Sequence, residues 1–307
     1  RNAHVASTCC CLHGTLHMMR SVGCVARADK VKGKQSVTNG DSVGLPGWAL
    51  DLLARPVSDA HQEIVDLSGL TPDEREAAAR RFPLARYCED AEVWVLNSTQ
   101  ARFRQLLSAF AREIPGNTTV VDFASAEADF VAYFQHCRYL AMDFSAAKLH
   151  RAIELGRVSF AVVADVTKSP LRECATDVIV STNTLMHLEH MLRGPAAGSL
   201  GRALRPGGLL ATTVLTSDVD AILAHLGGGF SVVEQCGLRG PLSRHVGERL
   251  ARVLRRVTQS RQPSIAGRQL IRAGNAAARA IARAERLALS AESERWAMQW
   301  LVVRKSA

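Results

Sequence analysis

The stretch "VVDFASAEADF", residues 120–130, decides the fold of this chain. A short apolar run ends at Asp122 and Phe123, and small residues follow at once. This pattern predicts a strand, a tight turn and a helix that begins at Glu127 and offers free backbone amides. Folds that bind nucleotide cofactors commonly place glycines in such a turn. Here alanines stand in the turn: Ala124, Ala126 and Ala128.

The rest of the chain after this stretch alternates short β-branched runs with segments long enough for a helix. Such alternation predicts βαβ units, right-handed crossovers and a Rossmann-like, mostly parallel α/β sheet with helices on both faces. The segment "RPGG", Arg205 to Gly208, is interpreted as the turn that enters the fifth strand. Seven strands are predicted, at residues 117–123, 138–144, 158–166, 176–182, 207–215, 230–238 and 297–305.

Composition excludes several protein classes. With 307 residues and 47% hydrophobic content, the chain can bury one principal core. No apolar run is long enough to predict a membrane span. The eight cysteines form no CxxC pairs, which favours reduced thiols and a cytoplasmic location. We predict no metal site, since the N-terminal candidates Cys11, His13, His17 and Cys24 lack the close cysteine pairs of structural zinc motifs.

Three regions follow from changes in pattern along the chain. Residues 1–45 show no sustained period and predict a disordered or leader-like tail. Residues 46–114 are mostly helical in pattern and predict an N-terminal cap. Residues 115–307 then form the main domain, with a basic helical insertion at 241–293.

Two helix starts are predicted within the cap. Thr71 can cap one helix, with Glu74 as the acid of a capping box. Ser98 or Thr99 can cap the next one. In that second helix the apolar residues share one face: Phe103, Leu106, Leu107 and Phe110.

Acids stand at the predicted carboxyl ends of consecutive strands. Asp122 ends the first strand, Asp143 ends the second and Asp165 follows the third. In open parallel sheets, ligands bind beyond these ends, where the strand order reverses. An acid about 20 residues after the first turn is placed to accept hydrogen bonds from ribose hydroxyls, and Asp143 has that position.

Five segments together resemble the successive motifs of the class I S-adenosylmethionine-dependent methyltransferases. They are "VVDFASAEADF", "YLAMDFSAAKL", "VVADVTKSPL", "TDVIVSTNTLMHLEH" and "LGRALRPGGLLATTV", in order between residues 118 and 214. The resemblance implies a seven-stranded sheet whose last strand is antiparallel. It also implies S-adenosylmethionine as cofactor and transfer of its methyl group to an unidentified, small-molecule acceptor.

The resemblance also implies roles for individual residues. The turn from Asp122 to Ala128 would face the methionyl part of the cofactor. Asp143 would bind the ribose, and residues 181–184 would line the methyl-transfer side. The adenine would lie near Phe144, Asp165 and the Val166 amide. The implied cofactor-binding residues are Asp122, Ala124, Ser125, Ala126, Asp143, Phe144, Asp165, Val166 and Asn183.

The missing glycines keep an alternative open. Alanine in left-handed geometry costs roughly 1–2 kcal/mol, although it is harmless where φ is negative. A non-catalytic methyltransferase-like scaffold or binding protein with a degenerate cofactor site is therefore the second hypothesis. A nucleotide-sugar or dinucleotide enzyme on a similar sheet is disfavoured, because the phosphate-cradling glycines are absent. No catalytic residue is assigned, and His187 and His190 are interpreted as structural or solvent-facing.

The basic character of the chain lies at its C-terminal end. Of the net charge of +9, residues 239–305 hold fourteen Arg and one Lys against four Glu. In the insertion, Leu250, Val253, Leu254 and Val257 are predicted to lie opposite most arginines of the first helix. A solvated helix face, a lid over an anionic acceptor, a nucleic-acid contact and a membrane-surface contact all remain open, with the lid preferred among functions and nucleic acid not favoured. In the second helix one stripe is predicted: Arg268, Arg272, Arg279, Arg283 and Arg286.

Overall fold

The computed structural model describes residues 45–54, 57, 63–71, 73–74, 97–257, 264–289 and 295–307. All of them lie within the compact unit Ser42–Ala307. The predicted tail, apart from Leu45, and the N-terminal cysteines and histidines therefore lie outside the described residues. None of the described helices is long and apolar enough to cross a membrane.

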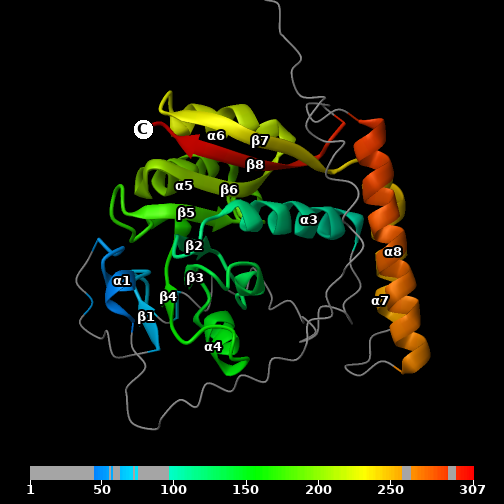
Figure 1. Ribbon diagram of the computed structural model, residues 1–307, viewed down its shortest axis with the longest axis horizontal. Helices are drawn as coiled ribbons and strands as arrows, with labels where there is room; N and C mark the ends of the chain where they lie inside the picture. Colours follow the sequence, from blue (N-terminus) through cyan, green and yellow to red (C-terminus); the bar gives the residue numbers. More distant parts are fainter. Residues whose placement is uncertain are drawn as a thin grey trace, which may run out of the picture. The chain divides into compact units, whose positions relative to one another are not determined.

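A single mixed sheet forms the centre of this unit (Figure 1). Its order is β1-β4-β3-β2-β5-β6-β8-β7, and every pairing is parallel except the two made by β8. This arrangement confirms the Rossmann-like sheet with an antiparallel last strand. The strands are β1 (Ile64–Asp66), β2 (Thr119–Phe123), β3 (Arg138–Asp143), β4 (Ala161–Val163), β5 (Thr176–Ser181), β6 (Leu204–Leu215), β7 (Phe230–Arg239) and β8 (Met298–Lys305).

The predicted count of seven strands is one short of the eight among the described residues. The additional strand, β1, lies in the region that was predicted to be a helical cap, and it pairs in parallel with β4 at the sheet edge. Three residues are too few for a period of two to be recognised. The "RPGG" segment is likewise not a turn before β6. It lies inside that strand, where Gly207 has a φ of 78°.

Helices cover both faces of the sheet. One face packs against α1 (Gly47–Leu50), α5 (His190–Ala203) and α6 (Val219–Leu226). The other packs against α3 (Ser98–Glu113) and α4 (Ala146–Glu154). All five residues of β2 are buried, as expected for a central strand with both faces covered.

The start of a helix at Thr71 is confirmed. The Thr71 amide donates to Glu74 Oε2 at 2.8 Å, and the Glu74 amide donates to Thr71 Oγ1 at 3.3 Å. These two bonds form the predicted capping box. The residues that follow Glu74 in this helix lie outside the described ones.

Helix α3 begins one residue earlier than predicted. Its N-cap is Asn97, not Ser98 or Thr99, and a capping box joins Asn97 to Gln100. The Gln100 amide donates to Asn97 Oδ1 at 2.8 Å, and the Asn97 amide donates to Gln100 Oε1 at 3.1 Å. The predicted apolar face is confirmed, because Phe103, Leu107 and Phe110 are buried and Leu106 is partly buried.

We expect Asn97→Ala to lower the free energy of unfolding by about 1 kcal/mol, because the substitution leaves an amide of the first turn without its acceptor. Urea unfolding measures the change. Gln105→Ala, at an exposed position in the middle of α3, is the control and should change stability by less than about 0.5 kcal/mol. Equal effects of the two substitutions would contradict the capping box.

The insertion between β7 and β8 is helical, as predicted. It contains a π-helical turn, η7 (Ser243–Gly247), then α7 (Glu248–Val257) and α8 (Ile265–Ala288), which lie together at one end of Figure 1. Leu254 and Ile271 are buried between the two helices. Val253, predicted to face inward, is 56% exposed, because Leu254 and Ala251 form the buried side of α7 instead.

Candidate cofactor site

The predicted acids lie along the side of the sheet that is formed by the carboxyl ends of its parallel strands, which is the edge meant below. Strands β2, β3 and β4 are parallel neighbours, so their carboxyl ends lie side by side. Asp122 is the fourth residue of the five-residue β2, and Asp143 is the last residue of β3. Asp165 follows β4 by two residues. The strand register therefore brings together the three carboxylates that the sequence placed at strand ends.

The turn after β2 has the backbone geometry that glycine usually provides. Ala124, Ala126 and Ala128 have φ angles of 64°, 51° and 53°. Left-handed backbone costs an alanine roughly 1–2 kcal/mol, so the turn is strained at three positions. Hydrogen bonds hold it in place, since the Ser125 amide donates to the Met142 carbonyl at 2.9 Å and the Ala128 amide to the Ser125 carbonyl at 2.8 Å.

The helix that was predicted from Glu127 does not form. A turn reaches Phe130, and the 3-10 helix η3 (Val131–Tyr133) follows. The left-handed conformation of Ala128 breaks the helical path, and few residues remain before β3 begins. Of the amides from Glu127 onward that were expected to be free for a cofactor carboxylate, that of Ala128 donates to the Ser125 carbonyl instead.

Asp143 fixes this turn from the neighbouring strand. Its Oδ2 accepts from the Ala126 amide at 2.8 Å, and its Oδ1 accepts from the Ser145 amide at 2.8 Å. Burial raises the pKa of the Asp143 carboxyl, and these backbone hydrogen bonds oppose that rise. A carboxylate can accept about four hydrogen bonds, so acceptor capacity remains for ribose hydroxyls.

Asp122 lies deeper in the same edge. It is 1% exposed, and the Tyr139 hydroxyl of β3 donates to its Oδ2. Burial raises the pKa of the Asp122 carboxyl from 3.8 to about 7, while the bond from Tyr139 lowers it and the nearby charges of Asp143 and Asp129 raise it. Asp122 is therefore half protonated near neutral pH in the folded protein.

We expect Asp122 to make the folded protein less stable as pH rises. The folded state holds a proton on this group that the unfolded chain has already released, so stability falls between about pH 4 and pH 7 and then levels off. Asp122→Asn removes the titration and keeps an acceptor for Tyr139. The stability of the variant relative to the wild type should therefore grow across this window, as measured by urea unfolding at several pH values. A difference that does not change with pH would contradict the assignment.

The residues predicted to hold the adenine follow β3 and β4. Asp165 caps the 3-10 helix η4 (Val166–Lys168), because its Oδ1 accepts from the Thr167 amide and hydroxyl, both at 2.8 Å. No bond to Asp165 Oδ2 forms within the described part of the chain. Val166 is buried and Phe144 is half-buried beside the edge.

The segment after β5 completes the edge. Asn183 is exposed, has a φ of 54°, and donates its amide to Thr213 Oγ1 of β6 at 2.6 Å. Two buried hydroxyls at the ends of β2 and β5, Ser125 Oγ and Ser181 Oγ, have no hydrogen-bond partner among the described residues. Polar groups at this edge are thus left for a ligand or water.

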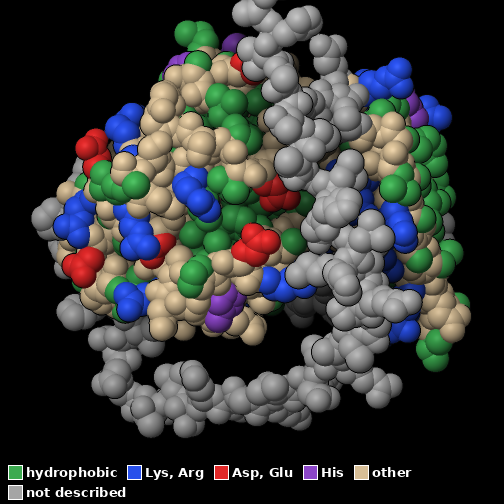
Figure 2. Space-filling view, turned by 45° about the horizontal axis from the view of Figure 1, so that its top comes forward, with side chains coloured by type: hydrophobic (Ala, Val, Ile, Leu, Met, Phe, Trp, Pro, Cys, Tyr) green, Lys and Arg blue, Asp and Glu red, His purple; other side chains and the backbone are tan. Residues whose placement is uncertain are grey.

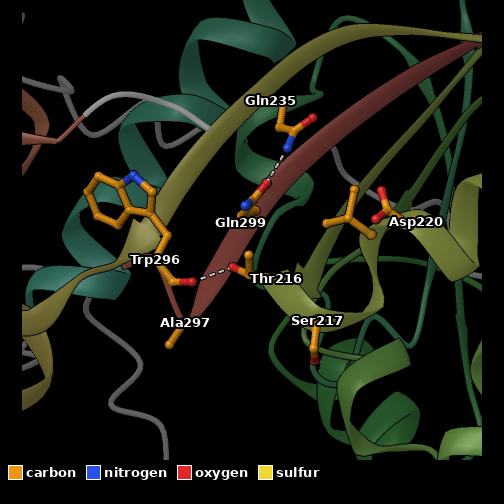
Figure 3. Close-up of a pocket in the computed structure, with 8 residues that line it drawn as sticks. Thr216, Ser217, Asp220, Gln235, Trp296, Ala297 and Gln299 are labelled. Atoms are coloured by element: carbon orange, nitrogen blue, oxygen red, sulfur yellow. Dashed lines mark hydrogen bonds between the residues drawn. The ribbon is translucent and has the colours of Figure 1, made fainter. Parts of the chain in front are cut away.

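A polar hollow, which the sequence did not predict, opens at the same edge beyond β6 (Figure 3). Its volume is about 590 Å³. Gln235 of β7 and Gln299 of β8 point toward each other and form a hydrogen bond of 2.6 Å. The sequence signal that could have revealed this hollow is the presence of these two glutamines in strands that are otherwise mostly apolar. The lining residues are Thr216, Ser217, Val219, Asp220, Gln235, Trp296, Ala297 and Gln299.

The two histidines of the fourth motif lie away from this hollow. Both side chains are exposed, and neither lines it. Partial loss of solvent around the His187 ring lowers its pKa, and the charges of Lys148 and Arg193 lower it further. His190 instead lies 4.0 Å from Asp218 Oδ1. Both histidines are thus solvent-facing, which is one of the two placements that the sequence predicted.

The fold is that of a Rossmann-like α/β protein whose strand order reverses between β2 and β5. In open α/β sheets, ligands bind at this switch in strand order. More specifically, residues 121–212 match the family model described as a methyltransferase domain. The match confirms the resemblance of this segment to the class I S-adenosylmethionine-dependent methyltransferases. A search of curated proteins finds no match.

Solved structures with similar folds include methyltransferases at low sequence identity. The N-methyltransferase NodS from Bradyrhizobium japonicum WM9, in complex with S-adenosyl-L-homocysteine, aligns at 14% identity and TM-score 0.48, over 76% of this chain and 99% of its own. Phosphoethanolamine N-methyltransferase 2 of Haemonchus contortus aligns at 14% identity and a TM-score of 0.46. This alignment covers 67% of this chain and 53% of that protein. The [4+2]-cyclase SpnF aligns at 15% identity and a TM-score of 0.46, over 76% of this chain and 93% of its own.

Proposed function

We propose that this protein transfers a methyl group from S-adenosylmethionine to a small-molecule acceptor. The observation that supports this most strongly is the turn from Ala124 to Ala128. It keeps the left-handed backbone of a glycine-rich cofactor turn without any glycine, and Asp143 ties it to the next strand. Since this backbone costs free energy, its presence at the predicted cofactor position favours a binding role.

The chain's residues fit this cofactor. Asp143 would hold the ribose with its remaining acceptor capacity, and Asp165 would use Oδ2 toward the adenine amino group. Phe144 and the Val166 amide would lie against the adenine ring. The bound cofactor would supply a methyl group on a positively charged sulfur. Asp122, Ser125 and Asn183 would lie toward its methionyl and methyl-transfer side.

The hollow beyond β6 is the proposed place for the acceptor. It adjoins β6, whose neighbour β5 ends beside Asn183, so an acceptor there would lie next to the methyl-transfer side. Asp220 contributes a carboxylate to its lining, and no Lys or Arg among the described residues does so. A neutral or cationic acceptor, such as an amine or alcohol, therefore fits better than the anionic acceptor considered from sequence.

Catalysis would depend chiefly on positioning. Holding an acceptor nucleophile in line with the methyl group converts a bimolecular reaction into an effectively unimolecular one, which accounts for up to about 7–11 kcal/mol of the barrier. The glutamine pair and Thr216 would orient the acceptor by hydrogen bonds. The acceptor would attack through a lone pair of its neutral form, the methyl–sulfur bond would break with its electrons left on sulfur, and the acceptor's proton would pass to water.

The second hypothesis, a non-catalytic methyltransferase-like binding protein, has its own support. The alanines at positive φ make the turn costly in free energy. The two backbone amides that already donate to Asp143 leave its carboxylate fewer acceptor positions for a cofactor. Thermal unfolding with S-adenosylhomocysteine separates the two. A competent site gives a rise in Tm that increases with ligand concentration. No rise at millimolar ligand would favour the binding protein, and a rise with NAD alone would support a dinucleotide site instead.

A further inference from the structure

Helix α8 has one side packed into the protein and an opposite side that is apolar but exposed. Its inner side packs on α7 and α3, with Ile271, Ala278 and Ala282 buried. On the outer side Ile265 is 81% exposed and Leu287 is 77% exposed. Between them Leu270 and a series of alanines are also exposed. Figure 2 shows green side chains along the outer edge of this helix.

Arginines lie beside this apolar face along the whole helix. The predicted stripe, Arg268 to Arg286, is exposed at every one of its positions. At 100° per residue it lies between the outer apolar side and the packed side. Blue side chains stand next to the green edge in Figure 2. The outer side of α8 is therefore an apolar surface with a cationic border.

Arginines far outnumber acids in this part of the chain. Residues 241–289 contain eleven Arg but only two Glu. Glu285 is 1% exposed and accepts from the Ser243 amide at 2.7 Å and from the Ser243 hydroxyl. Glu248 pairs with Arg239, at 2.6 Å between Oε1 and Nε. Within the described part of the insertion, both carboxylates are thus engaged internally.

The substrate-lid interpretation of the stripe loses support from the cavities. No residue of α8 lines the hollow beyond β6 or the smaller cavity between α5 and α6. A second copy of this chain is also a poor partner, because both copies carry the same excess of arginine and like charges repel. Nucleic acid would use the arginines but not the aliphatic side chains, and residues 241–289 contain no aromatic residue for base stacking.

We propose that the outer side of α8 docks on an anionic membrane surface. The 24-residue helix, about 36 Å long, would lie in the plane of the interface. Ile265, Leu270 and Leu287 would enter the headgroup region, and the arginines beside them would contact lipid phosphates. The charge and the apolar side chains would act together, as interfacial helices require. This inference is independent of the proposed methyl transfer.

Vesicle co-sedimentation of the full chain tests the proposal. The wild type should bind vesicles of equal parts phosphatidylcholine and phosphatidylserine, and bind phosphatidylcholine vesicles far less. Replacing Arg279, Arg283 and Arg286 by Gln should weaken binding to the anionic vesicles on the order of a hundredfold. Added salt should weaken wild-type binding as well.

The charge control replaces three exposed arginines of other elements by Gln: Arg138, Arg172 and Arg304. This variant has the same net charge as the stripe variant and should bind like the wild type. The apolar test is Ile265→Ser with Leu287→Ser, which should weaken binding about tenfold or more. Met191→Ser, at an 83% exposed residue of α5, is its control.

Each contrary result overturns the proposal. Absence of binding to anionic vesicles does so directly, as does equal binding by the stripe variant and its charge control. Binding to a DNA duplex that the Ile265→Ser and Leu287→Ser changes leave intact would indicate a nucleic-acid surface. Dimerisation in sedimentation velocity that Leu287→Ser abolishes would indicate contact between copies. Because all substituted side chains are exposed, an unchanged Tm verifies that each variant is folded.

Discussion

Asp143→Ala is expected to abolish the stabilisation by S-adenosylhomocysteine and to lower stability even without ligand. The loss of ligand response follows from the proposed ribose contact. The loss of stability follows from the hydrogen bonds, because the Ala126 and Ser145 amides would lose their shared acceptor. Leaving a buried donor unpaired costs about 1–3 kcal/mol, so two such amides predict a loss of roughly 3 kcal/mol. Thermal and urea unfolding, each with and without ligand, measure both effects.

A matched control separates a lost ligand contact from a merely weakened fold. Asp218 is also buried, and it accepts from Arg193 Nη1 at 2.6 Å, away from the proposed cofactor residues. Asp218→Ala should therefore destabilise the protein but leave the ligand-induced rise in Tm intact. If both variants kept the rise, Asp143 would not hold the ribose. If Asp143→Ala left the stability unchanged, its role in fixing the turn would be refuted.

The strands and their ends could be predicted because their signal is local. Short β-branched runs and the acids that follow them identified β2 to β8, and with them the edge where Asp122, Asp143 and Asp165 meet. Strand β1 could not be predicted in this way, because three residues carry no period and its pairing with β4 joins segments far apart in sequence. The hollow was missed for a related reason. Gln235 and Gln299 meet only through the pairing of β7 with β8.

The turn after β2 shows a different limit of sequence reasoning. Alanine is a strong helix former, so "ASAEADF" favours a helix by propensity. Tertiary hydrogen bonds from Ser125 to the Met142 carbonyl and from Ala126 to Asp143 hold a strained turn there instead. A local propensity of less than about 1 kcal/mol per residue is readily outweighed by such contacts.

Replacing the turn alanines by glycine is expected to stabilise the protein, although glycine usually destabilises. Each alanine at positive φ costs roughly 1–2 kcal/mol, which glycine avoids. Glycine costs about 0.4–1 kcal/mol through the greater freedom of the unfolded chain. The net gain for all three positions together is then about 2 kcal/mol, measured by urea unfolding. The substitutions are Ala124→Gly, Ala126→Gly and Ala128→Gly.

An alanine in an ordinary helix provides a control in which the same substitution should change stability in the opposite direction. Ala280→Gly, at an exposed interior position of α8, has ordinary helical geometry and should lose about 0.5–1 kcal/mol. The same chemical change is therefore expected to raise stability in the turn and lower it in the helix. Loss of stability at both places would mean that the turn is not left-handed. The Ala124→Gly and Ala126→Gly changes should also keep the response to S-adenosylhomocysteine, because both alanines are partly exposed at this edge and losing a Cβ there adds space.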